Sequence, residues 1–281
     1  MAVRAIEVVD KVAPRALQAY RQAFEQGDAL LAEYGISTPL RLAHFLAQAM
    51  HETGGLTILV ESGSYKQKGL AGMWDGGNWH RYFESRDACL KMADQCVVDR
   101  GEALFSLVYG NRLGNGPPET RDGWTYRGRG ILQTTGRENY RKYGRKCRVD
   151  FEGNPELIIA AEHALKPALA EWSEGNLNVA ADHDDIEVIT RRINGGLNGL
   201  DGRKAWLARI KPIVGGAKPV EQSLEWRVQE KLNALGYKKV KPDGVVGSKT
   251  RTAIIDYRSR HGLPAGTAIT DDLLQSLGVA R

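Results

Sequence analysis

Cysteine is scarce in this chain of 281 residues, where only Cys89, Cys96 and Cys147 occur. Three cysteines without paired spacing build neither a disulfide framework nor a paired-cysteine zinc site. The histidines show no ligand spacing either, and the HExxH motif of zinc proteases fails because Gly55 stands four residues after His51. We therefore expect free thiols, no metal ion and no cofactor.

Long apolar runs are also missing. No stretch approaches eighteen apolar residues, and Glu7, Asp10 and Lys11 interrupt the region where a signal peptide would carry its apolar segment. We expect a globular protein made in the cytoplasm, without an export signal and without stable membrane association. With 42% hydrophobic and 26% charged residues, the chain can bury a substantial core.

Positive charge is concentrated near the C-terminus. The net charge is +5, and residues 218–281 hold eleven Lys and Arg against seven Asp and Glu, a net of +4. A basic segment favours an anionic polymer as its partner. Charge alone leaves nucleic acid, acidic lipid and the bacterial envelope open as that partner.

The charge balance changes at a segment rich in glycine and proline, which predicts a linker over 214–222 between domains at 1–213 and 223–281. Helical periodicity predicts helices over 15–34, 39–52, 87–98, 155–173 and 185–193. Strand alternation is scarce. The first domain should be mainly α-helical, with long loops over 61–84 and 110–130 that carry function.

The predicted helix 39–52 ends in an acidic residue. Thr38 suits its N-cap and Pro39 its first position, and Gly54 or Gly55 suits its end. The apolar stripe of this helix consists of Leu42, Phe45, Leu46 and Ala49. Glu52 falls on that stripe at the C-terminus, where burial and the helix dipole should raise its pKa, as a general acid requires. The alternative, a surface acid that points into solvent, stays open on this evidence.

Three blocks follow one another in a distinctive order. They are AHFLAQAMHETGGLTILVES at 43–62, YRGRGILQTTGRENY at 126–140, and INGGLNG at 193–199 with DGR at 201–203. Together they resemble the glycoside hydrolase family 19 domain, which plant-type chitinases and many bacteriophage endolysins share. The resemblance covers about residues 30–213. It implies a lysozyme-like α-helical catalytic domain.

The resemblance also implies roles for three residues. Glu52 matches the general acid, Glu61 matches the general base that activates water, and Thr135 matches a residue that helps to hold this water. The implied mechanism inverts the anomeric centre. An inverting pair must leave room for water, so its carboxyl groups should lie roughly 6.5 to 9.5 Å apart.

Further positions match the family's substrate-binding cleft, namely Tyr65, Tyr126, Gln133, Asn139, Asn194 and Arg203. The chain departs from the family pattern after Glu61, where it reads SGSYK and only Tyr65 matches well. The GRG segment lacks the strand-to-helix context of a dinucleotide-binding loop. Trp74, Trp79, Tyr82 and Phe83 fit either sugar stacking or a local loop core, and both interpretations stay open.

The basic segment resembles a three-helix peptidoglycan-binding module. The motifs that carry this resemblance are VQEKLNALGY at 228–237, DGVVGSKTRTAI at 243–254 and GLP at 262–264. The residue pattern predicts a tight turn at 243–247, a helix capped by Ser248, and a small core. The expected core residues are Leu232, Leu235, Ile254 and Leu263. A packing appendage without a ligand is the alternative.

A glycosidase joined to a peptidoglycan-binding module is most simply a lytic enzyme of the endolysin type, which hydrolyses β-1,4 bonds of the cell wall. We expect it to act as a monomer on peptidoglycan, after another protein lets it through the membrane, and not to bind nucleic acid. Two alternatives remain. One is a chitinase acting on β-1,4 N-acetylglucosamine polymers, and the other is an inactive wall-binding protein.

Overall fold

The computed structural model describes residues 3–215, 224–240, 242, 244 and 246–280. Within these residues the regular elements are helices, and extended pairing is limited to the isolated bridges Val60–Arg129 and Arg129–Thr134. This confirms the prediction of a mainly α fold. No helix in the described ranges is both long and apolar enough to cross a membrane.

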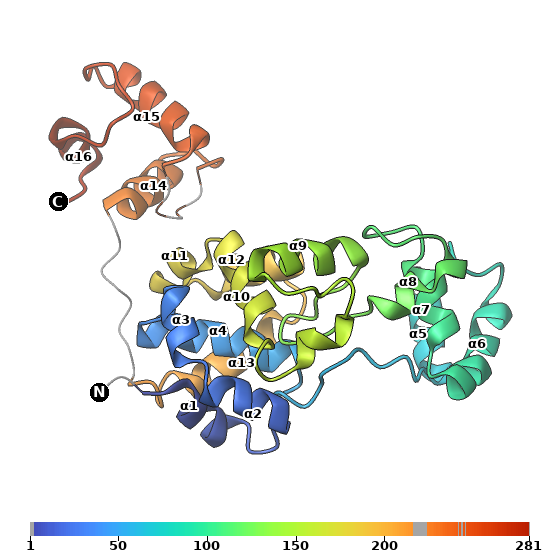
Figure 1. Ribbon diagram of the computed structural model, residues 1–281. Helices are drawn as coiled ribbons and strands as arrows, with labels where there is room; N and C mark the ends of the chain where they lie inside the picture. Colours follow the sequence, from blue (N-terminus) through green and yellow to red (C-terminus); the bar gives the residue numbers. More distant parts are fainter. Residues whose placement is uncertain (1–2, 216–223, 241, 243, 245, 281) are drawn as a thin grey trace.

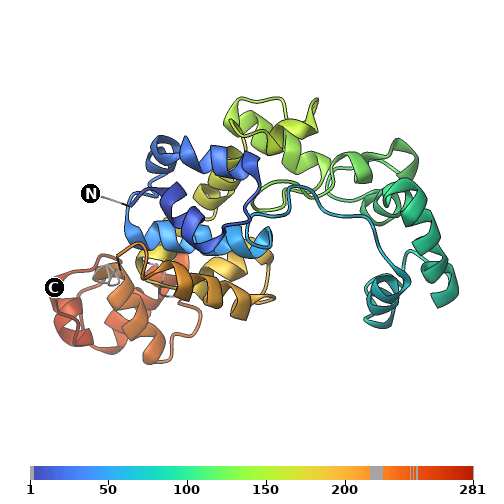
Figure 2. The same cartoon turned by 90° about the horizontal axis from the view of Figure 1, so that it is seen from below.

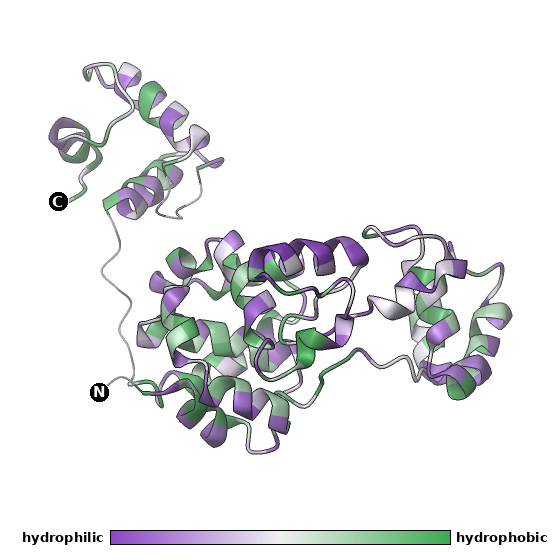
Figure 3. Ribbon diagram, viewed as in Figure 1, coloured by the Kyte–Doolittle hydropathy of each residue, from purple (hydrophilic) through white to green (hydrophobic). Residues whose placement is uncertain are grey.

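The main helical body of the first 215 residues is drawn in blue, yellow-green and orange in Figure 1. Its elements are α1 (Ala5–Val12), α2 (Gln18–Glu25), α3 (Asp28–Glu33), α4 (Pro39–Glu52), α9 (Arg137–Cys147), η2 (Pro155–Ile159), α10 (Leu165–Glu174), α11 (Leu177–Asp182), α12 (Ile186–Asn194) and α13 (Leu200–Ile210). One large apolar cluster joins most of these helices, while a smaller one lies under α9 around Tyr140 and Phe151. Figure 3 shows α9 as a largely hydrophilic helix, as its sequence RENYRKYGRKC requires.

Helix α4 lies at the centre of this body, and it begins and ends where its sequence predicts. Thr38 accepts a hydrogen bond from the Arg41 N–H at 3.2 Å, and Pro39 is the first helical residue. Gly54 and Gly55 follow the helix with φ of 58° and 78°, a region that glycine adopts without strain. The four residues of the predicted apolar stripe are all buried. Glu52 is therefore fixed at the end of the most deeply packed helix.

Two glycines allow α13 to approach the end of α4. A Cβ placed on Gly199 would lie 2.2 Å from His51 Nε2, and a Cβ on Gly202 would lie 2.6 Å from His51 Nδ1. Real side chains do not approach each other this closely, so the imidazole occupies space that only glycine leaves open. The glycine-rich block at 193–203 thus serves close packing between α4 and α13.

We expect Gly202→Ala to lower the free energy of unfolding by roughly 1 to 3 kcal/mol, because the added methyl group must displace the His51 ring. Gly196→Ala is the matched control, since a Cβ there meets no atom within 4 Å and such substitutions usually change stability by less than about 0.5 kcal/mol. Urea unfolding of both variants measures the difference. Equal stability of the two variants would contradict the packing role of Gly202.

Helices α5 (Gln67–Asp75), α6 (Arg86–Asp99), α7 (Glu102–Tyr109) and α8 (Asp122–Thr125), with η1 (Pro118–Thr120), form a separate lobe. Figures 1 and 2 both show this lobe beside the main body, joined by the segments before α5 and after α8. It has its own apolar core. The predicted loop over 61–84 is therefore partly wrong, because α5 lies within it.

The aromatic residues predicted in the loop 61–84 lie in the core of this lobe. Trp79 is buried, and Trp74, Tyr82 and Phe83 pack against the same cluster. They form a local core, and this interpretation is preferred over stacking on sugars. Cys89 and Cys96 also lie in this core, and all three cysteines are free thiols, as expected. Burial raises the pKa of each thiol, which keeps it protonated.

Other helix boundaries differ from those that the apolar periodicity predicts. The predicted helix 15–34 is two helices, α2 and α3, with Gly27 between them, and the predicted helix 155–173 is η2 followed by α10. Helices α1, α7, α9, α11 and α13 were not predicted from the periodicity.

The C-terminal part consists of α14 (Leu224–Ala234), α15 (Ser248–Arg260) and α16 (Asp271–Leu277) around their own apolar core, which confirms three helices. Leu232 and Ile254 are buried as predicted, but Leu235 is 51% exposed. Ser248 is the first helical residue and caps nothing, because Gly247 is the N-cap. The predicted turn at 243–247 includes positions 243 and 245, which lie outside the described residues.

Gln229 joins the two sequence motifs of this part. Its Nε2 donates to Thr250 Oγ1 at 3.0 Å, and its Oε1 accepts from the Gly244 N–H at 2.8 Å. The side chain is buried, so both hydrogen bonds form away from water, where they stabilise the fold most. The glutamine of the first motif therefore fixes the turn and the helix of the second.

Candidate active site

Glu52 is held by a buried arginine. Its Oε1 accepts a hydrogen bond from Arg203 of α13, and a second guanidinium nitrogen of Arg203 donates to Gln48 Oε1, one turn earlier on α4. The Arg203 side chain is 2% exposed and the Glu52 side chain 21%. A buried guanidinium requires such partners, because an unpaired charge is costly to bury. Arg203, which the sequence analysis predicted as a site residue, thus lies beside Glu52.

The Arg203 contact gives Glu52 a cationic partner that its position on the predicted helix did not indicate. No hydrogen bond from the described residues reaches Oε2, so this oxygen is left for a ligand. Helical spacing within α4 cannot reveal a partner that lies on α13.

A second carboxyl group interacts with Glu52, and it escaped the sequence analysis. Burial raises the pKa of Glu171, on α10, to about 7; Lys142 opposes this shift, and the negative charge of Glu52 adds to it. Repulsion between two nearby carboxylates favours a proton on one of them. Glu171 stands between the buried residues Ala170 and Trp172, a position that could have indicated an acid partly withdrawn from water.

Glu61 is positioned by backbone pairing with the GRG segment. The Glu61 N–H donates to the Gly128 carbonyl at 2.8 Å, and the Gly130 N–H donates to the Leu59 carbonyl at 2.9 Å. The bridge between Val60 and Arg129 lies between these two bonds. Two motifs far apart in the sequence therefore meet edge to edge, and their pairing fixes the backbone that carries Glu61.

Two donors hold the Glu61 carboxylate. The Tyr109 hydroxyl lies 3.0 and 3.1 Å from Oε1 and Oε2, and the Gly128 N–H donates to Oε2 at 3.3 Å. Burial raises the pKa of Glu61, and the two hydrogen bonds and the charge of Arg127 partly offset this effect. The net result is a carboxylate that is more basic than an ordinary glutamate.

The absence of a side chain at Gly128 lets three oxygen atoms converge. A Cβ at this position would lie 3.2 Å from Glu61 Oε2, 3.2 Å from Thr135 Oγ1 and 3.0 Å from Gln133 Oε1. Thr135 donates its hydroxyl hydrogen to the Gln133 carbonyl at 2.8 Å, so its lone pairs remain as acceptors. The structure thus brings the sequence-predicted residues Glu61, Gln133 and Thr135 together around one point.

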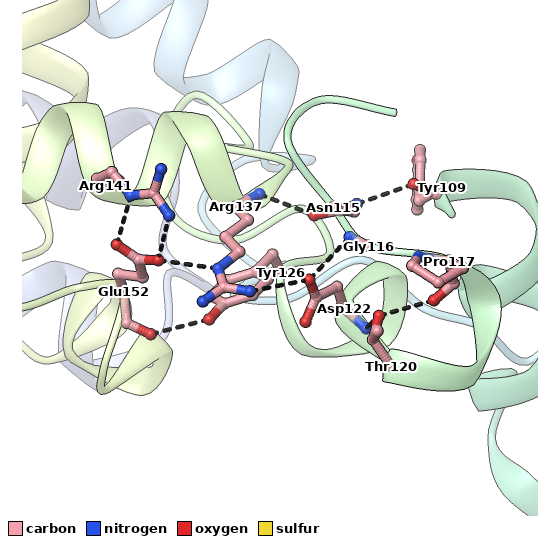
Figure 4. Close-up of polar contacts among 10 residues, drawn as sticks. All are labelled: Tyr109, Asn115, Gly116, Pro117, Thr120, Asp122, Tyr126, Arg137, Arg141 and Glu152. Atoms are coloured by element: carbon pink, nitrogen blue, oxygen red, sulfur yellow. Dashed lines mark hydrogen bonds and ion pairs between the residues drawn. The ribbon is translucent and has the colours of Figure 1, made fainter. Parts of the chain in front are cut away.

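Tyr109 was not predicted, although its place depends on the predicted second motif. Figure 4 shows how α9 is connected to the end of α7. Asn115 donates to the Tyr109 carbonyl at 2.9 Å and accepts from the Arg137 N–H at 2.8 Å, while the Arg137 side chain contacts Asp122 at 3.3 Å and Glu152 at 2.8 Å. This network fixes the tyrosine that contacts Glu61.

We expect Tyr109→Phe to move the acidic limb of the kcat/KM profile to higher pH. The hydroxyl stabilises ionised Glu61, so its loss raises the pKa of this carboxyl further. The base must be ionised to act, and as the pH falls it then becomes protonated at a higher pH than in the unmodified protein. Tyr82→Phe is the matched control, because the Tyr82 hydroxyl contacts Arg112 in the same lobe. A uniform loss of activity at every pH would contradict this role of Tyr109.

Two predicted cleft tyrosines lie in packed surroundings. Tyr65 contacts Trp79 and Phe105 at ring-centroid distances of 5.4 and 6.5 Å. Tyr126 is 7% exposed and donates its hydroxyl to the Glu152 carbonyl at 3.1 Å (Figure 4). Both rings therefore have a packing role, and Tyr65 is half-buried, so their contact with a substrate stays a prediction.

The two predicted asparagines are placed differently. Asn139, at the start of α9, donates to the Thr135 carbonyl at 2.8 Å and so supports the loop that carries Thr135. Asn194, at the end of α12, is exposed and donates to the Asn198 carbonyl at 3.2 Å. Asn139 therefore organises the site, while Asn194 remains accessible to a ligand.

Comparison with known protein families finds similarity over both parts of the chain. Residues 227–274 match the family model described as a putative peptidoglycan binding domain. A glycosyl hydrolase family 19 domain-containing protein of Haemophilus influenzae is 34% identical over 195 residues, which cover 69% of this chain and 88% of that protein. An acidic endochitinase of Petunia hybrida is 31% identical over 129 residues, 39% of this chain and 46% of the petunia protein.

Solved structures with partial similarity include chitinase C from Streptomyces griseus, at 20% identity and a TM-score of 0.48, where the match covers 76% of this chain and 78% of the chitinase. A bacterial family 19 chitinase is 21% identical with a TM-score of 0.47, over 76% of this chain and 96% of that one.

Proposed function

We propose, from the premise that this chain belongs to glycosyl hydrolase family 19 and carries a peptidoglycan-binding domain in its C-terminal part, that it is a cell-wall lytic enzyme of the endolysin type. Its reaction would be hydrolysis of β-1,4 glycosidic bonds in bacterial peptidoglycan with inversion at the anomeric carbon. It would reach the wall after another protein opens a path through the membrane.

The observation that carries this proposal is a pair of carboxylates with different partners. Glu52 is fixed by a cation through one oxygen, and Glu61 is fixed by a hydroxyl and a backbone N–H. Glycosidases use two carboxyl groups with different tasks, one giving a proton and one receiving it. Different surroundings for two acids are the means by which a protein separates these tasks.

Glu52 acts in this proposal as the general acid. Arg203 orients the carboxyl group through Oε1, and Oε2 carries the proton to the glycosidic oxygen as the bond breaks. The negative charge of Glu52 helps to raise the pKa of Glu171, so the two carboxyl groups interact within the site.

Glu61 acts as the general base. It withdraws a proton from a water molecule on the opposite face of the sugar, and this water attacks the anomeric carbon. Thr135 Oγ1, which lies near the same point as the Glu61 carboxylate, accepts a hydrogen bond from that water. Gln133 and exposed Asn194 supply polar atoms to the sugar, and Asn139 holds the Thr135 loop.

Mass spectrometry of fragments from purified peptidoglycan tests the proposed reaction. Borohydride reduction labels each new reducing end, so reduced muramic acid identifies a muramidase and reduced glucosamine a glucosaminidase. Peptidoglycan that yields no new reducing ends while N-acetylglucosamine polymers are cleaved would identify a chitinase instead. The similarity to the petunia endochitinase makes this second function worth the parallel assay.

We also propose that 1–213 and 223–281 are separate domains joined by 214–222, since their apolar cores are distinct. Removal of residues 218–281 should leave hydrolysis of a soluble oligosaccharide within about a factor of three and reduce sedimentation with sacculi at least tenfold, because the basic binding module is lost. Equal sedimentation of both proteins would show that the removed part does not bind the wall.

A further inference from the structure

A basic groove crosses the C-terminal module. It has a volume of about 610 Å³ and lies between the turn 236–240 and the exposed side of α15. Buried Val240 and Ala253 form its floor, and the side chains of Lys238, Lys239 and Lys249 stand on its exposed rim. An apolar floor with a cationic rim fits a ligand that carries both methyl groups and anions.

Most of the positive charge in this groove is not neutralised. Asp256 is the acidic residue of the lining, and it already accepts from Arg260 at 2.8 Å and from the Tyr237 hydroxyl at 2.8 Å. Lys239 and Lys249 form no ion pair with the rest of the described chain, and Lys238 donates to a backbone carbonyl at 3.2 Å. Three ammonium groups are therefore available to an anionic ligand.

The start of α15 adds to this field. The helix has 13 residues, and its N-cap, Gly247, makes no side-chain hydrogen bond to the first turn. Ser248 and Lys249 of that turn line the groove. One end of the groove therefore lies beside the first turn of α15, where the positive end of the helix dipole adds to the attraction of the lysine side chains for a carboxylate.

We propose that this groove binds the stem peptide of peptidoglycan through the peptide's carboxylates, an inference that rests on the proposed cell-wall function. In peptidoglycan the acetylated sugars are uncharged, and the lactyl carboxyl group is consumed in the amide bond to the peptide. The negative charges lie on the stem peptide, next to alanine methyl groups. Lys239 and Lys249 bind the carboxylates, and the floor of Val240 and Ala253 receives a methyl group.

Nuclear magnetic resonance titration of the full chain with a synthetic, sugar-free stem peptide tests this site. Lys239→Gln together with Lys249→Gln should weaken binding at least about tenfold, the loss expected for two hydrogen bonds to charged groups. Lys231→Gln together with Arg251→Gln is the matched control, because it removes the same charge outside the groove. The control should bind like the unmodified protein.

A peptide whose carboxylates are converted to amides should bind at least about tenfold more weakly to the unmodified chain. Absence of stem-peptide binding, equal weakening in both double variants, or equal affinity for the amidated peptide would each overturn the proposal. Hydrolysis of soluble glycan is measured in parallel. If the unmodified chain and all variants fail to hydrolyse glycan while the peptide binds as expected, the proposed reaction is contradicted but the proposed peptide-binding site is supported.

Discussion

Glu52→Gln is expected to reduce hydrolysis by roughly 10²- to 10⁴-fold, the contribution of a positioned general acid. The amide has the shape of the acid but cannot give a proton to the leaving oxygen. Its carbonyl oxygen can still accept from Arg203, so the buried guanidinium keeps a partner and the fold is retained. Release of reducing ends from purified sacculi measures the loss.

Glu187→Gln serves as the matched control, because Glu187 is an acid of α12 that pairs with Lys204 on the exposed surface. It should keep full activity. Circular dichroism should show that both variants have the helical content and melting temperature of the unmodified protein. Activity of Glu52→Gln within tenfold of the unmodified protein would remove Glu52 from the proton-transfer step.

Glu61→Ala is expected to cause a loss of similar size, roughly 10²- to 10⁴-fold, because it removes the proposed base that activates the attacking water. The Tyr109 hydroxyl and the Gly128 N–H lose their acceptor but keep access to solvent through the space of the removed carboxylate. Since the base never bonds to the sugar in an inverting reaction, no glycosyl-enzyme adduct should accumulate in the unmodified protein.

Proton nuclear magnetic resonance of a short β-linked oligosaccharide during hydrolysis by the unmodified protein, recorded before mutarotation, reports the anomeric configuration of the first product. Water attack from the face opposite the leaving group gives the α anomer as the first product. A β anomer would indicate a retaining reaction in which a carboxylate attacks the sugar. In that case the roles assigned to Glu52 and Glu61 would have to be exchanged for a nucleophile and an acid/base.

Local sequence determined several features of this protein that the structure confirms. The Thr38 cap, Pro39 and the following glycines define α4 because each acts within one or two helical turns. The three helices of the C-terminal part are set in the same way by short motifs with their own small core. The sequence also placed Glu52 at a helix end.

The tertiary structure alone decided how these two acids are held. Arg203 reaches Glu52 across 151 residues of sequence, and Tyr109 reaches Glu61 across 48. Helical periodicity reports which face of one helix is apolar, but it carries no information about which distant helix packs there. The lobe of α5–α8 and the close approach of α13 to α4 depend on such packing. The chemical surroundings of the acids therefore follow from long-range contacts, because a carboxylate's ionisation responds to every charge, donor and water molecule within a few ångströms, whatever its place in the chain.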